Sequence, residues 1–210
     1  MDTVINCRRC RRLTAFRASV QQEFPDYYCL PVDSFGDHSA RLLIVGLAPG
    51  KHGANATGRA FTGDASGKLL FETLHKFGFA NKSNSVARDD GMILKSCRIT
   101  NAVKCLPPQN KPLSGEINQC NHFLRQEINS LSSGSIILAL GAIAHKAVVK
   151  ALNLPQKCYK FAHHAQHQLC TGIKLIDSYH CSRYNTQTRR LSVNMFEQVF
   201  ADIRIRLDCG

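Results

Sequence analysis

Stretches with the apolar patterns of strands and of helices alternate four times along this chain of 210 residues. Short apolar runs typical of buried strands lie at residues 42–45, 99–105, 135–141 and 173–180. Stretches with apolar residues at helical spacing lie at 67–78, 115–131, 142–153 and 192–207. This alternation favours an α/β fold, with a mostly parallel central β-sheet flanked by helices on both faces.

The length suits one domain, so we predict a single domain over residues 1–210. Residues 1–40 lack the alternation and are expected to form an N-terminal arm. Residues 83–91 are expected to form an exposed loop.

Three loops follow predicted strands, at residues 46–68, 107–114 and 180–190. In this architecture the loops at the carboxyl ends of parallel strands build the ligand site, so we expect these three to meet. The first loop ends in GDASGK, which is similar to a phosphate-binding loop. However, Gly63 and Gly67 enclose three residues instead of four, and Leu69 replaces the Ser or Thr that should follow the lysine. A nucleotide-binding α/β protein is therefore only an alternative.

The charge of the chain favours a polyanionic partner. Lys and Arg number 27 against 15 Asp and Glu, which gives a formal net charge of +12. Excess positive potential attracts nucleic acid above all. No stretch is apolar for long enough to span a bilayer, and no apolar signal core follows the first charged residues. We therefore expect a cytoplasmic monomer that binds DNA or RNA and has no membrane partner.

Ten cysteines in a chain without a secretion signal point to metal ligation more than to disulfides. Cys7 and Cys10 form a C-x-x-C pair, and Cys105 and Cys120 follow later with 14 residues between them. Four thiolates suit either tetrahedral zinc or a four-iron cluster. One close pair with two single ligands favours the cluster, while scattered buried thiols are the alternative. The other six cysteines show no such pairing.

Several motifs together resemble a known family. GLAPGKHGAN, GRAFTGD, NAVKCLPPQNKP and HCSRYNT, with the four spaced cysteines, resemble the iron-sulfur branch of the uracil-DNA glycosylase superfamily. The extended HGAN and the acid in FTGD are closer to its family 5 than to family 4, whose members carry an acidic residue where this chain has Leu47. The resemblance runs from Cys7 to about Thr186.

The resemblance implies a DNA repair enzyme that flips a deaminated base out of DNA and hydrolyses its N-glycosidic bond, leaving an abasic site. Uracil is the expected base, with hypoxanthine and xanthine as further candidates. It also implies a structural [4Fe-4S] cluster on Cys7, Cys10, Cys105 and Cys120, with zinc as the less favoured occupant. The alternative is a non-catalytic, metal-stapled module that binds nucleic acid.

Three residues in the loops or at the predicted strands are the candidate catalytic groups. His180 is at the end of the last predicted strand and would donate to the O2 oxygen of the departing base. Asp64 would orient a water molecule and stabilise the cationic sugar. Without the resemblance, its position before SGKLL predicts a helix N-cap. The amide of Asn101 has a donor and an acceptor, enough to pair with the edge of uracil, although a strand-end Asn is often satisfied by backbone.

Further residues are expected to bind the substrate. Phe61 would stack on the flipped base, its alternative role being that of a core aromatic. Two glycines and three polar residues complete the candidate substrate-binding set: Gly46, Gly50, His52, Asn55 and Asn185. The glycines would permit close approach of the backbone, and the loop SRYNTQTRR would contact phosphates and fill the gap left by the base.

Overall fold

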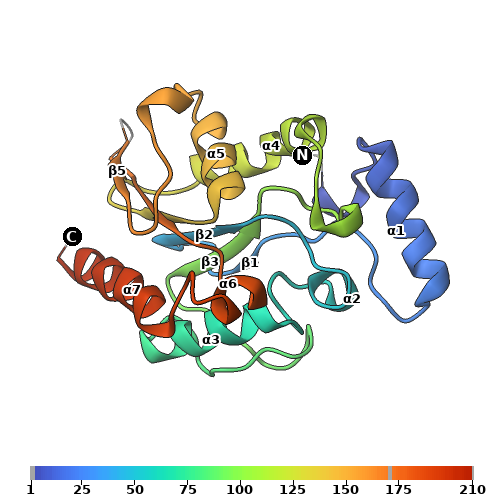
Figure 1. Cartoon of the computed structure of the whole chain (residues 1–210), viewed down its shortest axis with the longest axis horizontal. Coiled ribbons are helices and arrows are strands. Elements are labelled where there is room, and N and C mark those ends of the chain that lie inside the picture. Colours follow the sequence, from blue (N-terminus) through green and yellow to red (C-terminus); the bar gives the residue numbers. More distant parts are fainter. Residues whose placement is uncertain (1–2, 170–171, 210) are drawn as a thin grey trace.

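The computed structural model describes residues 3–169 and 172–209, and a β-sheet runs through its centre (Figure 1). The strand order is β1-β3-β2-β4-β6-β5. The strands are β1 (Phe35–Gly36), β2 (Leu42–Gly46), β3 (Cys97–Asn101), β4 (Ile136–Leu140), β5 (Gln166–Gln168) and β6 (Lys174–Ser178). The inner four pair in parallel, and β1 and β5 pair antiparallel at the two edges. The predicted, mostly parallel sheet is confirmed.

Helices cover both faces of the sheet, as predicted (Figure 1). Leu42 and Ile44 of β2 pack in one core with α3 (Ala65–Lys76) and α7 (Val193–Asp208). Leu43 and Val45 point to the opposite core, with α4 (Ser114–Asn129) and α5 (Ala142–Ala151). Because both faces are buried, β2 is fully buried along its length and reads as an unbroken apolar run.

The N-terminal arm contains structure that the sequence analysis did not predict. Helix α1 (Arg11–Glu23) lies beyond one end of the sheet (Figure 1), and β1 also falls within residues 1–40. Leu13 packs near Cys105 and Phe123, and Val20 packs on a separate small cluster with Phe16. These apolar residues do recur at helical spacing, but the arginines between them conceal it.

Strand β3 ends earlier than predicted. It stops at Asn101, and two further backbone hydrogen bonds, from Ala102 to Gly46 and from Val103 to Leu47, guide the chain out of the sheet. Asn101 therefore lies at the carboxyl edge, whereas Cys105 lies in the following loop. No helix in the described ranges is long and apolar enough to cross a bilayer.

The loop at residues 83–91 is only partly exposed, because Arg59 anchors it. The Arg59 guanidinium lies 2.7 Å from Asp90 Oδ2 and also donates to Ser85 Oγ and to the carbonyl of Arg88. Both charged side chains are buried, at 4% and 7% exposure. Burial alone would raise the pKa of Asp90, but hydrogen bonds from Arg59 and from backbone N–H groups hold it well below its usual range.

Replacing Asp90 by Asn leaves the Arg59 charge buried without its partner. We expect Asp90→Asn to lower the free energy of unfolding at pH 7 by about 3 kcal/mol. Because the folded-state pKa of Asp90 is depressed, its contribution is complete above about pH 4 and is lost as the pH falls further, so the deficit of the variant narrows in acid. Urea unfolding over a pH series measures this. The exposed neighbour provides the control, Asp89→Asn, and equal losses in both variants would contradict the anchor.

Candidate active site

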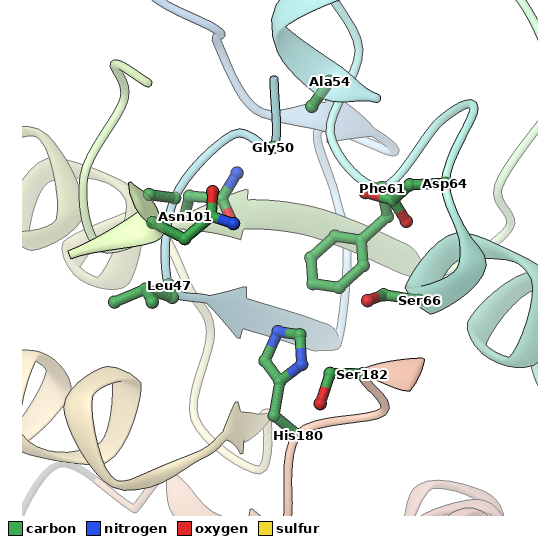
Figure 2. Close-up of a pocket in the computed structure, with 11 residues that line it drawn as sticks. Leu47, Gly50, Ala54, Phe61, Asp64, Ser66, Asn101, His180 and Ser182 are labelled. Atoms are coloured by element: carbon green, nitrogen blue, oxygen red, sulfur yellow. The ribbon is translucent and has the colours of Figure 1, made fainter. Parts of the chain in front are cut away.

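The three predicted loops do meet, at the carboxyl ends of β2, β3 and β6. They enclose a cavity of about 310 Å³ (Figure 2). Its lining is Leu47, Ala48, Gly50, Ala54, Phe61, Asp64, Ser66, Asn101, Asn110, His180 and Ser182. Every loop contributes, so the expected convergence is confirmed. The volume lies at the lower end of the range for small-molecule sites.

Phe61 is held in the cavity by close contact with two glycines. A Cβ atom on Gly46 would lie 2.6 Å from the Phe61 ring, and a Cβ on Gly67 would lie 1.7 Å from the Phe61 carbonyl oxygen. Phe61 itself has a φ of 57°, which is unusual for a bulky residue. Such strain persists only where the surroundings enforce it, and it concentrates at functional sites. Phe61 is thus a pocket residue with a fixed ring and not only a core aromatic.

Asn101 presents an amide to the cavity from the end of β3 (Figure 2). The residue is 3% exposed, and its side chain has no hydrogen-bond partner among the described residues. A buried amide normally has partners, so an unpaired one that lines a cavity is available to a ligand. Gly46 makes room here as well, because a Cβ there would lie 2.5 Å from Asn101 Oδ1.

His180 follows β6 and points towards Phe61 (Figure 2). The two ring centroids lie 6.0 Å apart, with 24° between the planes. Burial lowers the pKa of His180 to about 4, so the imidazole is neutral at pH 7 and carries one N–H. The imidazole has no hydrogen-bond partner in the described ranges. Asn185 does not line the cavity; its Nδ2 donates to the carbonyl oxygen of His180 at 2.8 Å and so fixes the backbone there.

Asp64 is the helix N-cap considered for it in sequence, and it also lies in the cavity where its catalytic role was expected. It is the N-cap of α3, where Oδ1 accepts the Gly67 N–H at 2.8 Å, and it also lines the cavity. The other oxygen, Oδ2, faces Gly50 and Gly53; a Cβ atom on Gly53 would lie 2.6 Å from it. Burial raises the pKa of Asp64, and the backbone N–H groups of Gly67 and Ser66 offset part of the rise.

His52 and Asn55 lie near the site but do not line it. His52 is exposed and its Nδ1 lies 2.9 Å from the Tyr27 hydroxyl. Asn55 is fully buried and donates to Cys29 Sγ at 3.3 Å. Both residues connect the glycine loop to the chain that follows α1.

The sequence analysis missed several residues that line the cavity: Leu47, Ala48, Ala54, Ser66, Asn110 and Ser182. Most are small or apolar and carry no chemical signal. Asn110 has a polar side chain in the predicted loop at 107–114, and that position was the only signal available.

The four candidate metal ligands lie together in a second, mostly apolar pocket behind the active site. Cys7 and Cys10 precede α1, with Cys10 at its N-cap position, whereas Cys105 lies in the loop after β3 and Cys120 lies on α4. All are free thiols. Burial raises the pKa of Cys105 to about 12 and of Cys120 to about 11.

A metal must displace the thiol protons of these cysteines, because thiolates are the ligands. The backbone N–H of Lys104 donates to Cys120 Sγ at 3.2 Å, which favours sulfur that carries negative charge. The donor set therefore fits four-thiolate ligation. Of the other cysteines, Cys29, Cys97 and Cys181 are buried and Cys158 and Cys209 are exposed, whereas Cys170 lies outside the described residues.

Comparison with known proteins agrees with this architecture. The family model for the uracil DNA glycosylase superfamily matches residues 34–204. The type-5 uracil-DNA glycosylase of Pyrobaculum aerophilum is 40% identical over 214 residues, covering 100% of this chain and 92% of the relative. That of Thermus thermophilus is 41% identical, covering 97% and 95%. A type-4 enzyme of Pyrobaculum aerophilum is 37% identical over 60% of each chain. The chain therefore belongs to the uracil DNA glycosylase superfamily, and within it to the type-5 branch.

Proposed function

We propose that this chain is a uracil-DNA glycosylase, which hydrolyses the N-glycosidic bond of uracil in DNA and leaves an abasic site. One observation carries the proposal: a single cavity is lined by Phe61 and Asp64 of the first loop, by Asn101 at the end of β3 and by His180 after β6. The net charge of +12 supports binding of the DNA backbone. A base within a duplex is out of reach, so the nucleotide has to swing out into this cavity.

The flipped base stacks on Phe61 and is read by Asn101. Two stacking gaps of about 3.5 Å need about 7 Å, more than the 6.0 Å between the Phe61 and His180 ring centroids. The base therefore stacks on one face of Phe61 and does not slot between the two rings. The free amide of Asn101 then pairs with the polar edge of uracil, accepting from its N3–H and donating to its O4.

His180 assists departure of the base as an anion. Negative charge develops on O2 of uracil as the bond lengthens, and the neutral imidazole donates its single N–H to that oxygen. A neutral donor in a buried site stabilises the developing charge without transferring its proton. Asn185 has a positioning role, because its bond to the His180 carbonyl fixes the backbone from which the imidazole extends.

Asp64 acts on the sugar side of the bond. Its Oδ1 is occupied by the Gly67 N–H, so Oδ2 is the oxygen that orients the attacking water and stabilises the cationic sugar. The absence of a side chain on Gly50 and Gly53 keeps Oδ2 accessible.

We further infer that Cys7, Cys10, Cys105 and Cys120 hold a [4Fe-4S] cluster, with zinc as the alternative occupant. When bound, the cluster supplies a covalent cross-link and no step of bond cleavage. The four residues tie the start of the chain to the loop after β3 and to α4. Ala48, which lines the active-site cavity, also packs against this cysteine cluster, so the two sites share a wall.

Loss of the His180 imidazole removes the donor to the departing base. We expect His180→Ala to slow uracil release by about 10²–10³-fold, the usual cost of one such donor. Oligonucleotides with a single uracil or hypoxanthine, treated with alkali after single-turnover reaction, report strand breaks at the lesion. The control is His38→Ala, an exposed histidine that bonds Arg98 near the edge strand β1. Activity of His180→Ala equal to that of the control would refute the assignment.

The acid limb of the pH profile should belong to Asp64. The carboxylate must be ionised, and burial raises its pKa above the ordinary 3.8. The single-turnover rate is therefore expected to fall as the pH drops through that raised value. Burial lowers the pKa of His180 to about 4, so its protonation adds a second limb only near and below that pH. We expect Asp64→Asn to have a low rate that no longer shows this fall in acid. If the same fall remains in the variant, the acid limb belongs to another group.

Replacing one cysteine ligand should release the cluster and destabilise the fold before it changes the rate of bond cleavage. We expect anaerobically purified protein to contain four irons per chain, the count of one such cluster, and to absorb visible light broadly. We expect Cys120→Ser to lose both the iron and thermal stability, whereas the exposed Cys158→Ser should retain them. If the protein is colourless and contains one zinc per chain, the four cysteines bind zinc and not an iron-sulfur cluster.

A further inference from the structure

A second group of metal-binding side chains lies outside the active site and the cysteine cluster. His145 on α5, Asp177 on β6 and His167 on β5 place one ligand atom each within 4.8 Å of one another. His145 Nδ1 lies 2.8 Å from Asp177 Oδ1, and His167 Nε2 lies 3.2 Å from Asp177 Oδ2. Uracil cleavage uses none of these residues.

The cluster needs a positive charge. Asp177 is 0% exposed, and a buried carboxylate is costly unless a cation pairs with it. Both nitrogens of His145 face oxygen acceptors, because Nε2 lies 3.0 Å from the carbonyl of Tyr159. A neutral imidazole has a single N–H and satisfies only one of them. Either an additional proton or a metal ion must lie between His145 Nδ1 and Asp177.

We propose that His145, His167 and Asp177 bind a divalent transition metal of the zinc class. Two imidazoles and a carboxylate are a common three-ligand zinc set, with water at the fourth position. The bond from His145 Nε2 to the Tyr159 carbonyl fixes the tautomer that leaves Nδ1 free for a metal, as the second partners of metal-binding histidines do.

The spacing suits this ion. Tetrahedral zinc with bonds of about 2.05 Å separates its ligand atoms by about 3.3 Å, and the two contacts with Asp177 measure 2.8 and 3.2 Å. The two contacts join different oxygens of Asp177, and the three ligand atoms lie within 4.8 Å of one another, so the side chains must shift for one ion to bind all three. His167 is 14% exposed and provides the route from solvent.

The metal would fasten the edge of the sheet close to the active site. Its ligands come from α5, β5 and β6, and Tyr159 belongs to the segment that leads into β5. Strand β6 carries Asp177 and ends just before His180. The proposed role is structural and does not depend on the glycosylase reaction.

Zinc titration of the holoprotein, with its cysteines already occupied, tests the site. We expect one Zn²⁺ per chain in calorimetry and a rise in Tm. Co²⁺ bound at the same site should give a visible spectrum without thiolate charge-transfer bands. His167→Gln and His145→Gln should weaken Zn²⁺ binding by roughly 100-fold or more. The matched control is His164→Gln, on the same segment but paired with Asp202 at 3.0 Å, and it should bind Zn²⁺ as the wild type does.

Several results would overturn the proposal. The first is equal Zn²⁺ affinity in wild type and in His167→Gln, the least buried ligand. The second is a ¹⁵N spectrum of His145 that shows protons on both ring nitrogens in excess Zn²⁺, which would assign the charge to an imidazolium. If both variants fail to fold, the test is the effect of Zn²⁺ on the Tm of the wild type. A Tm that Zn²⁺ leaves unchanged refutes the site.

Discussion

The active site depends on how closely the end of β2 approaches the chain around it. No side chain extends from Gly46, so the Phe61 ring and the Asn101 amide occupy the space beside its Cα. On its other side Phe61 meets Gly67, where the first turn of α3 lies against its carbonyl. The ring thus lies against a strand end, and the backbone of the same residue lies against a helix start. This packing fixes the Phe61 and Asn101 side of the cavity in place, which is the kind of preorganisation that a binding site needs.

Burial acts in opposite directions on the two titratable groups of this cavity. It raises the pKa of Asp64 and lowers that of His180, since in each case it disfavours the charged form. Backbone N–H groups of Gly67 and Ser66 offset part of the rise in the pKa of Asp64, whereas burial alone lowers the pKa of His180 to about 4. The same burial therefore favours the neutral form of both groups, which is the acid form of Asp64 and the uncharged imidazole of His180.

The sequence predicted the features that depend on local pattern and chain order. Buried parallel strands read as apolar runs, and their carboxyl ends determine where the loops meet, so the fold and the positions of Phe61, Asn101 and His180 were predictable. Helix α1 was hidden by its arginines, and β5 is a polar edge strand of three residues. His52 and Asn55 share the glycine loop with the lining residues but turn to Tyr27 and Cys29. Side-chain direction within an irregular loop depends on distant partners that no local pattern reveals.

The two edges of the sheet have a consequence for the protein in a crowded cell. Exposed strand edges recruit strands from other molecules, which begins aggregation. Here β1 has two residues and β5 has three, and each runs against the direction of its neighbour. Little free backbone remains for an incoming strand to pair with, while the inner strands, of five residues each, are confined to the interior of the sheet. As long as β1 and β5 stay paired with their neighbours, the four inner strands cannot pair with strands of another molecule.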